Sequence, residues 1–168
     1  MMSIKDQIGL DFQFFNAVEP EDITKDLEER YFSHVDFYQW NINAKAAMAT
    51  FMSHMKLLKW AAESKTNLLI LEDDININRP FDYEQIDFGE FDLYNVGLKF
   101  SCYAYFVSHE GASNLLNHFH MVKITQAYDW ELSKIKSLRF KFIDAPLFYQ
   151  IQDRFPSNIT PTDGYKKR

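Results

Sequence analysis

The chain has 168 residues, a length typical of one domain with a substantial core. Apolar residues make up 46% and aromatic residues 17%, which excludes a disordered chain and favours a core built on Phe and Tyr. The formal charge of −6, from 18 basic and 24 acidic residues, argues against a large nucleic-acid interface, because such an interface needs a basic face. We therefore expect one globular domain over residues 1–168, with an irregular tail over 150–168.

Cysteine content and hydropathy narrow the class further. The single Cys102 excludes an internal disulfide and any zinc site built from several cysteines. No run of about 18 apolar residues is present, so we expect no membrane-spanning helix. The first six residues lack the apolar core of a signal peptide. The sequence thus predicts a cytoplasmic protein and leaves its oligomeric state open.

The first half of the chain predicts a short strand and then a long helix. Asp11–Phe15 alternates Phe with polar residues, as a small strand does. Apolar residues spaced by three and four predict a helix over Ala44–Ser64, which Asn43 can cap. Ser53 and His54 lie within this helix. From the helix pattern alone, His54 is a partly buried histidine packed on the core.

The most informative stretch joins an apolar run to three carboxylates. Leu68–Leu71 predicts a strand buried on both faces, and Glu72, Asp73 and Asp74 follow it directly. Ligands of open α/β sheets bind outside the carboxyl ends of the strands. An extended backbone would put Glu72 and Asp74 on one side, where they could share a divalent cation that holds a diphosphate. The alternative is a strand end followed by a solvated acidic turn.

The rest of the chain predicts strands and helices in alternation. In chain order they are the strands Asp92–Val96 and Cys102–Val107, the helices His109–His118 and Trp130–Lys136, and the strand Arg139–Ile143. Ser108 and Asp129 are suitable N-caps for the two helices. We expect Leu68–Leu71 to be the central strand, flanked by the helices Ala44–Ser64 and His109–His118.

An ordered set of motifs resembles one known family, glycosyltransferase family 25, which contains bacterial lipopolysaccharide galactosyltransferases and collagen galactosyltransferases. The family has a helix ending in Ser-His, a Leu-Ile-Leu-Glu-Asp-Asp motif, a Trp-Asp-Leu-Leu-Tyr-Leu-Gly strand, a segment with Ala-Tyr, Ser, Gly-Ala and Leu-Leu, and a later Asp. The similar segments here are Ala47–His54, Leu69–Asp74, Phe91–Gly97, Ala104–Ser108 with Gly111, Ala112, Leu115 and Leu116, and Asp129. Together the resemblance extends from about Gly9 to Ile159.

The resemblance implies a glycosyltransferase A-type (Rossmann-like) α/β fold, with a mixed sheet flanked by helices. Members usually open with a Val-Ile-Asn-Leu-Asp-Arg strand, and we expect this chain to begin after it, N-terminally shortened. The implied reaction is an inverting transfer of galactose or another hexose from a UDP-sugar to a hydroxyl. A divalent cation, Mn²⁺ or Mg²⁺, held by Glu72, Asp73 and Asp74 would neutralise the leaving diphosphate.

The resemblance also suggests roles for five more residues. Asp129 is the first candidate for the base that deprotonates the acceptor hydroxyl, and Glu131 is the second. Ser53, His54 and Tyr105 are candidates for the pocket that binds the donor. Two simpler interpretations stay open, because Asp129 could serve only as a helix cap and Tyr105 only as a core tyrosine.

The acceptor and two competing functions are left open by the sequence. Family analogy suggests a saccharide of lipopolysaccharide. A short enzyme from a phage could instead modify a host glycan or a hydroxymethylated DNA base, although the negative charge disfavours DNA. A non-catalytic relative, acting as a binding module or a subunit of a larger enzyme, would also fit a shortened N-terminus. A nuclease or phosphatase using the three carboxylates would need further ligands that converge in space.

Overall fold

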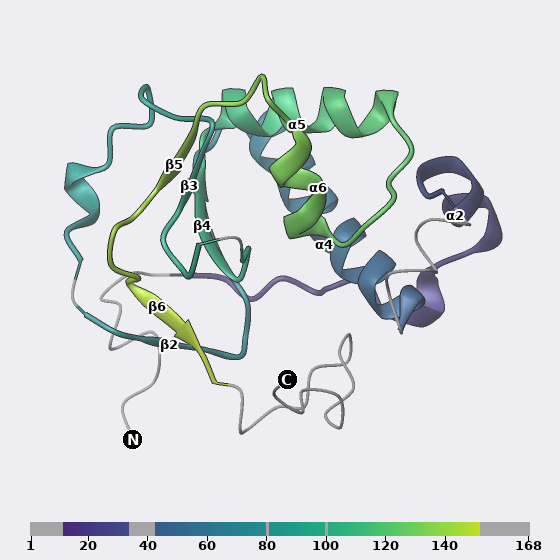
Figure 1. The fold of residues 1–168 in the computed structure, drawn as a ribbon, viewed down its shortest axis with the longest axis horizontal. Coiled ribbons are helices and arrows are strands. Elements are labelled where there is room, and N and C mark those ends of the chain that lie inside the picture. The colour runs from purple at the N-terminus through teal and green to yellow at the C-terminus, as the bar shows by residue number, and fades with distance from the viewer. Residues whose placement is uncertain (1–11, 34–42, 80, 100, 152–168) are drawn as a thin grey trace, which may run out of the picture.

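The computed structural model describes residues 12–33, 43–79, 81–99 and 101–151 (Figure 1). It is a mixed α/β structure in which a four-stranded mixed sheet packs against helices. The strands, in their order across the sheet, are β1 (Leu68–Leu71), β4 (Ala104–Val107), β3 (Leu93–Asn95) and β5 (Phe140–Phe142). The first three run antiparallel to their neighbours, whereas β3 and β5 are parallel. A separate antiparallel pair joins β2 (Ile75–Ile77) to β6 (Phe148–Gln150).

Side-chain caps start the two longest helices of the described residues. These helices are α4 (Ala44–Ser64) and α5 (His109–Met121). The Asn43 side chain accepts a hydrogen bond from Ala46 N, and Ser108 Oγ accepts one from Gly111 N. Two shorter helices are α2 (Lys25–Tyr31) and α6 (Tyr128–Lys134), and two 3₁₀ helices cover Pro20–Asp22 and Tyr83–Gln85.

The four-stranded sheet separates two apolar clusters. In β4 all four residues are buried, and their side chains alternate between the two faces. Tyr105 and Val107 join a cluster with α4, α5 and α6, which Figure 1 shows gathered beside the sheet. Ala104 and Phe106 join a second cluster with β2, β6 and the aromatic residues of the 81–91 loop. The sheet is therefore covered by helices on one face and by a loop and a small sheet on the other.

The predicted central position of β1 is wrong. Within the described part of the chain, β1 has a neighbour on one side only, and the central strands are β4 and β3. Side chains of Leu68–Leu71 do reach both clusters, but only Ile70 is fully buried. The helices α4 and α5 lie together on one face rather than on opposite faces. An apolar run identifies a strand with two covered faces, but it does not show which strands pair with it.

Element boundaries follow the sequence prediction most closely where caps are strong. The helix predicted over Ala44–Ser64 is confirmed at both ends. The helix expected at Trp130 begins at Tyr128, with Ala127 in the capping position, so Asp129 lies in the first turn and is not the cap. Residues 12–15 form no strand. Asp11 and the predicted tail beyond residue 151 lie outside the described residues. In those that are described, no helix is long and apolar enough to cross a bilayer.

The start of α5 packs directly on the backbone that enters β3, and this contact can be tested. A Cβ added at Gly111 would lie 2.2 Å from the carbonyl oxygen of Asp92. We expect Gly111→Ala to lower the free energy of unfolding by about 1–3 kcal/mol or more, since backbone must shift to make room. Denaturant unfolding measures the change.

Gly89→Ala is the matched control, because its added Cβ would meet only a side-chain oxygen of Asp87, at 3.1 Å. Equal stability of the Gly111 and Gly89 variants would contradict the close packing of α5 against the start of β3.

Candidate functional site

A buried histidine connects three elements at the centre of the candidate site. His54 of α4 is 5% exposed, and its Nδ1 lies within hydrogen-bond distance, 2.8 Å, of the Tyr105 hydroxyl in β4. The ring of His54 stacks on the ring of Tyr128 in α6, with centroids 4.2 Å apart and an angle of 3°. The two tyrosine hydroxyls are 3.3 Å apart. We call His54, Tyr105 and Tyr128 the histidine node.

The histidine node lies beside two of the predicted carboxylates. Nε2 of His54 is 3.8 Å from Oε1 of Glu72, whose side chain is 34% exposed. Asp129 follows Tyr128 directly and is close enough to Glu72 and His54 for their charges to act on it. Burial raises the pKa of Asp129 above its usual value, and the charge of Glu72 acts in the same direction. The fold thus brings His54, Glu72, Tyr105 and Asp129 together, although they are far apart in sequence.

The three consecutive carboxylates diverge at the end of β1. Glu72 extends β1 through a bond from its N–H to Tyr103 O (2.8 Å), and its side chain lies near His54. Asp73 is exposed in the turn that follows. Asp74 turns toward the second sheet, where its Oδ2 accepts a hydrogen bond from Gln150 Nε2 (2.7 Å). The side chains therefore do not form the convergent ligand set that a nuclease or phosphatase would need.

Asp74 nevertheless has one oxygen that lacks a partner among the described residues. Its Oδ1 is buried and accepts no hydrogen bond. Burial raises the pKa of Asp74, and the neighbouring charges of Glu72 and Asp73 raise it further, against the hydrogen bond from Gln150. A buried carboxylate oxygen in an acidic surrounding is the arrangement in which a cation is most stabilising.

A metal held by protein side chains alone does not fit this geometry. In the described ranges no three His, Cys, Asp or Glu side chains are arranged to hold a metal ion. The unpaired oxygen of Asp74 fits instead an ion that is held by one or two carboxylates and takes its other ligands from water and a diphosphate, as Mg²⁺ commonly does.

Glu131 and Ser53 have structural partners. Glu131 is 3% exposed, and its Oε1 accepts hydrogen bonds at 2.7–2.8 Å from Thr125 N, Thr125 Oγ1, Gln126 N and Lys134 Nζ. These bonds occupy Oε1 with protein donors and hold the loop before α6 in place. Ser53 donates to Ala49 O (2.9 Å) and accepts from Val18 N (2.8 Å), which ties the 12–19 segment to α4. Asp129 thereby becomes the better candidate base.

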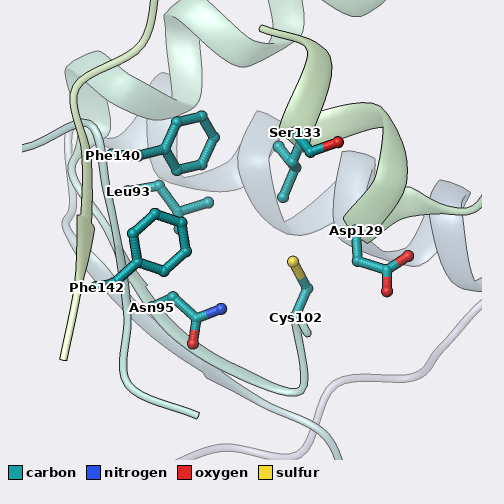
Figure 2. Close-up of a pocket in the computed structure, with 8 residues that line it drawn as sticks. Leu93, Asn95, Cys102, Asp129, Ser133, Phe140 and Phe142 are labelled. Atoms are coloured by element: carbon teal, nitrogen blue, oxygen red, sulfur yellow. The ribbon is translucent and has the colours of Figure 1, made fainter. Parts of the chain in front are cut away.

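A pocket of about 210 Å³ opens beside Asp129 (Figure 2). Phe140 and Phe142 of β5 lie on one side, and Asp129 and Cys102 lie on the other. The remaining lining residues are Leu93, Asn95, Leu132 and Ser133. Burial holds the pKa of the Cys102 thiol well above its usual value, and the charges of Asp129 and Glu72 act in the same direction. Cys102 is therefore a neutral wall of the pocket rather than a nucleophile.

Sequence reasoning missed Tyr128, Gln150 and the wall formed by Cys102, Phe140 and Phe142. Tyr128 immediately precedes the candidate base, and its aromatic side chain was the one sequence feature that could have indicated a buried contact there. The partnership of Gln150 with Asp74 spans 76 positions and depends on the β2–β6 pairing, which no local pattern indicates.

Comparison with known proteins identifies the family of the chain. A family model described as glycosyltransferase family 25 (LPS biosynthesis protein) matches residues 1–93, more than half of the chain. The matched part contains His54 and the three carboxylates, whereas Tyr105, Tyr128 and Asp129 follow it. No curated protein matches the chain.

The electrostatic setting of Asp129 predicts a pH-dependent stability. The pKa of Asp129 is raised in the folded state. Its contribution to the free energy of unfolding is therefore fully present below the unfolded-state pKa, near 4, and is lost as the pH rises through the folded-state pKa. Asp129→Asn removes this loss. We expect the melting temperature of the variant, relative to wild type, to increase between pH 4 and pH 7.

Asp92→Asn provides the opposite case. Burial alone would raise the pKa of the Asp92 carboxyl. The hydrogen bonds and the charge of Arg139 outweigh burial and lower this pKa below its usual value. Its contribution is present above the unfolded-state pKa and is lost as the pH falls through the folded-state pKa. A difference between Asp129→Asn and wild type that stays constant with pH would contradict the burial of the Asp129 carboxyl.

Proposed function

The chain belongs to glycosyltransferase family 25, and from this premise we propose that it transfers a hexose from a UDP-sugar to a hydroxyl acceptor with inversion at the anomeric carbon. UDP-galactose is the first candidate donor, and a saccharide is the proposed acceptor. The observation that carries the proposal is that Asp129 and Glu72 lie together beside His54, at the end of β1. The mixed sheet with helices on one face is compatible with a glycosyltransferase A-type fold, which we propose for the chain.

Asp129 is proposed as the base. The acceptor oxygen attacks the anomeric carbon as its proton passes to the Asp129 carboxylate, and the bond from that carbon to the diphosphate oxygen breaks. UDP leaves with the electron pair of the broken bond. A raised pKa suits this role, because a carboxylate with a higher proton affinity is a stronger base in its ionised form.

Glu72 follows β1 directly, and its charge acts on Asp129. Its carboxylate is partly exposed and lies 3.8 Å from Nε2 of His54. We propose that Glu72 and Asp74 would hold Mn²⁺ or Mg²⁺ together with the donor diphosphate. Such an ion supplies charge neutralisation for the leaving group. Asp73, exposed in the turn, is proposed to add negative potential.

The histidine node would act by positioning. His54 and Tyr128 stack within the core, and Tyr128 is the residue directly before Asp129. This contact fixes the first turn of α6, and with it the position of the base relative to Glu72. Tyr105 holds the orientation of the His54 ring through Nδ1.

Substitution of the base separates chemistry from binding. We expect Asp129→Asn to abolish transfer while UDP binding stays nearly unchanged, because the base acts on the acceptor and not on the donor. Transfer is measured as sugar appearing on a saccharide acceptor, and UDP binding is measured by calorimetry. Glu63→Gln, which removes an exposed carboxylate of α4, is the control. Full activity of Asp129→Asn would remove Asp129 from the reaction.

Metal dependence is tested through Asp74. UDP with Mn²⁺ should stabilise wild type by about 2.7 kcal/mol at a hundredfold excess over the dissociation constant. Asp74→Asn should lose the Mn²⁺-dependent part of this gain and about 10²–10³ in transfer rate. Because it removes a partly buried charge, it should not lower the melting temperature of the metal-free protein. Unchanged transfer in Asp74→Asn, or transfer that persists in a chelator, would contradict the metal site.

A further inference from the structure

Gln150, the last residue of β6, bonds to one of the carboxylates that follow β1. We propose that Gln150 is a positioning residue that holds one oxygen of Asp74, so that Asp74 offers a single oxygen to the ion and a small octahedral cation is favoured over Ca²⁺. This inference rests on the proposed function and deepens it, because it assigns the class of cation and the residue that selects it.

The position of Gln150 is fixed by the backbone of two strands. In the β2–β6 pair, Ile75 lies opposite Gln150. The next residue, Ile151, donates its N–H to Asp74 O (2.7 Å). Ile75 and Phe148, both 1% exposed, anchor the pair in the second apolar cluster. The side chain of Gln150 therefore extends from a fixed backbone position, and loss of its amide would leave the strand pairing in place.

The two oxygens of the Asp74 carboxylate have different surroundings. Oδ2 accepts a hydrogen bond from Nε2 of Gln150 (2.7 Å), whereas Oδ1 is buried and has no hydrogen-bond partner among the described residues. A cation bound by both oxygens at once would also approach Oδ2, where the amide already donates. Gln150 thus orients the carboxylate as a ligand through Oδ1 alone, which is how the hydrogen-bonded partner of a metal ligand commonly acts.

Gln150 holds Asp74 without neutralising its charge. An amide donates a hydrogen bond but carries no charge of its own. The buried carboxylate of Asp92, by contrast, is paired with the guanidinium of Arg139 at 3.0 Å. The charged groups that act on Asp74 are the two carboxylates directly before it in the chain. Asp74 therefore keeps the negative charge that attracts a cation.

A single ligand oxygen suits a small cation better than a large one. Mg²⁺ takes about six ligands at about 2.1 Å in octahedral geometry, and one or two carboxylates with water and phosphate oxygens supply them. Mn²⁺ accepts the same octahedral set of oxygens. Ca²⁺ takes roughly six to eight oxygens at about 2.3–2.6 Å, and carboxylates that bind through both oxygens help to provide them. Restricting Asp74 to one oxygen therefore favours Mg²⁺ and Mn²⁺ over Ca²⁺.

Calorimetric titration of UDP into the full chain tests the proposal without a transfer assay. The dissociation constant of UDP is measured in excess MnCl₂, in excess CaCl₂ and in a chelator. Gln150→Met keeps the length of the side chain but removes its donor. We expect this variant to bind UDP in MnCl₂ about 10–100-fold more weakly than wild type, the usual cost of losing the partner of a metal ligand. Affinity in CaCl₂ should fall less or rise, and affinity in the chelator should not change.

Two further variants complete the experiment. Gln150→Asn retains an amide but withdraws it from Oδ2 of Asp74, so it should behave as Gln150→Met does. Gln85→Met is the matched control, because Gln85 Nε2 donates to Asp82 Oδ2 (2.8 Å), an equivalent bond that is exposed. It should leave all three dissociation constants unchanged.

The comparison of the two salts separates positioning from damage to the fold, because unfolded protein reduces the binding-competent fraction equally in both. An equal loss of affinity in MnCl₂ and CaCl₂, or no loss in either, would overturn the role of Gln150 while the proposed function stands. Failure of the proposed function would be seen in wild type, as no UDP binding or as equal binding in MnCl₂ and in the chelator. Either result would also overturn the inference.

Discussion

The stacking of His54 on Tyr128 is the contact on which the candidate site depends. The helix α6 has only seven residues and no side-chain cap, so its own hydrogen bonds do not fix it. Two anchors hold it: Tyr128, buried against His54 and near Tyr105, and Glu131, whose carboxylate fastens the preceding loop. Asp129 lies between these anchors and is therefore presented at a fixed position. Loss of either anchor would displace the proposed base even though neither touches the proposed substrate.

The acidic turn after β1 serves two sheets at once, which explains why its carboxylates diverge. Glu72 continues the pairing of β1 by donating its N–H to Tyr103 O. Asp74 leads into β2, and it accepts hydrogen bonds from Gln150 of β6 and from the N–H of Ile151, which follows β6. One turn thus joins the four-stranded sheet to the β2–β6 pair. Clustering negative charge there is unfavourable in the protein alone, and the raised pKa of Asp74 reflects this, with burial as its main cause. A cation bound together with a diphosphate would reduce the repulsion between these carboxylates and would stabilise the ionised form of Asp74.

Local patterns in the sequence predicted well what depends on nearby residues. Contacts between residues a few positions apart determine the helix Ala44–Ser64, its Asn43 cap and the Ser108 cap. The family motifs are also local in sequence, and family membership is confirmed. Partners distant in sequence were not predictable, among them the edge position of β1, the β2–β6 pair and the stacking of Tyr128 on His54. Asp129 lies in the first turn of α6 and is not its cap, because the helix starts two residues earlier than expected, at Tyr128, whose ring is buried in the core.

A crystal structure of the chain with UDP-galactose and Mn²⁺ would test the central claim most directly. We predict that the diphosphate and the ion lie beside Glu72 and Asp74, with the anomeric carbon directed toward Asp129. A nucleotide bound away from these carboxylates, or an anomeric carbon directed away from Asp129, would contradict this prediction.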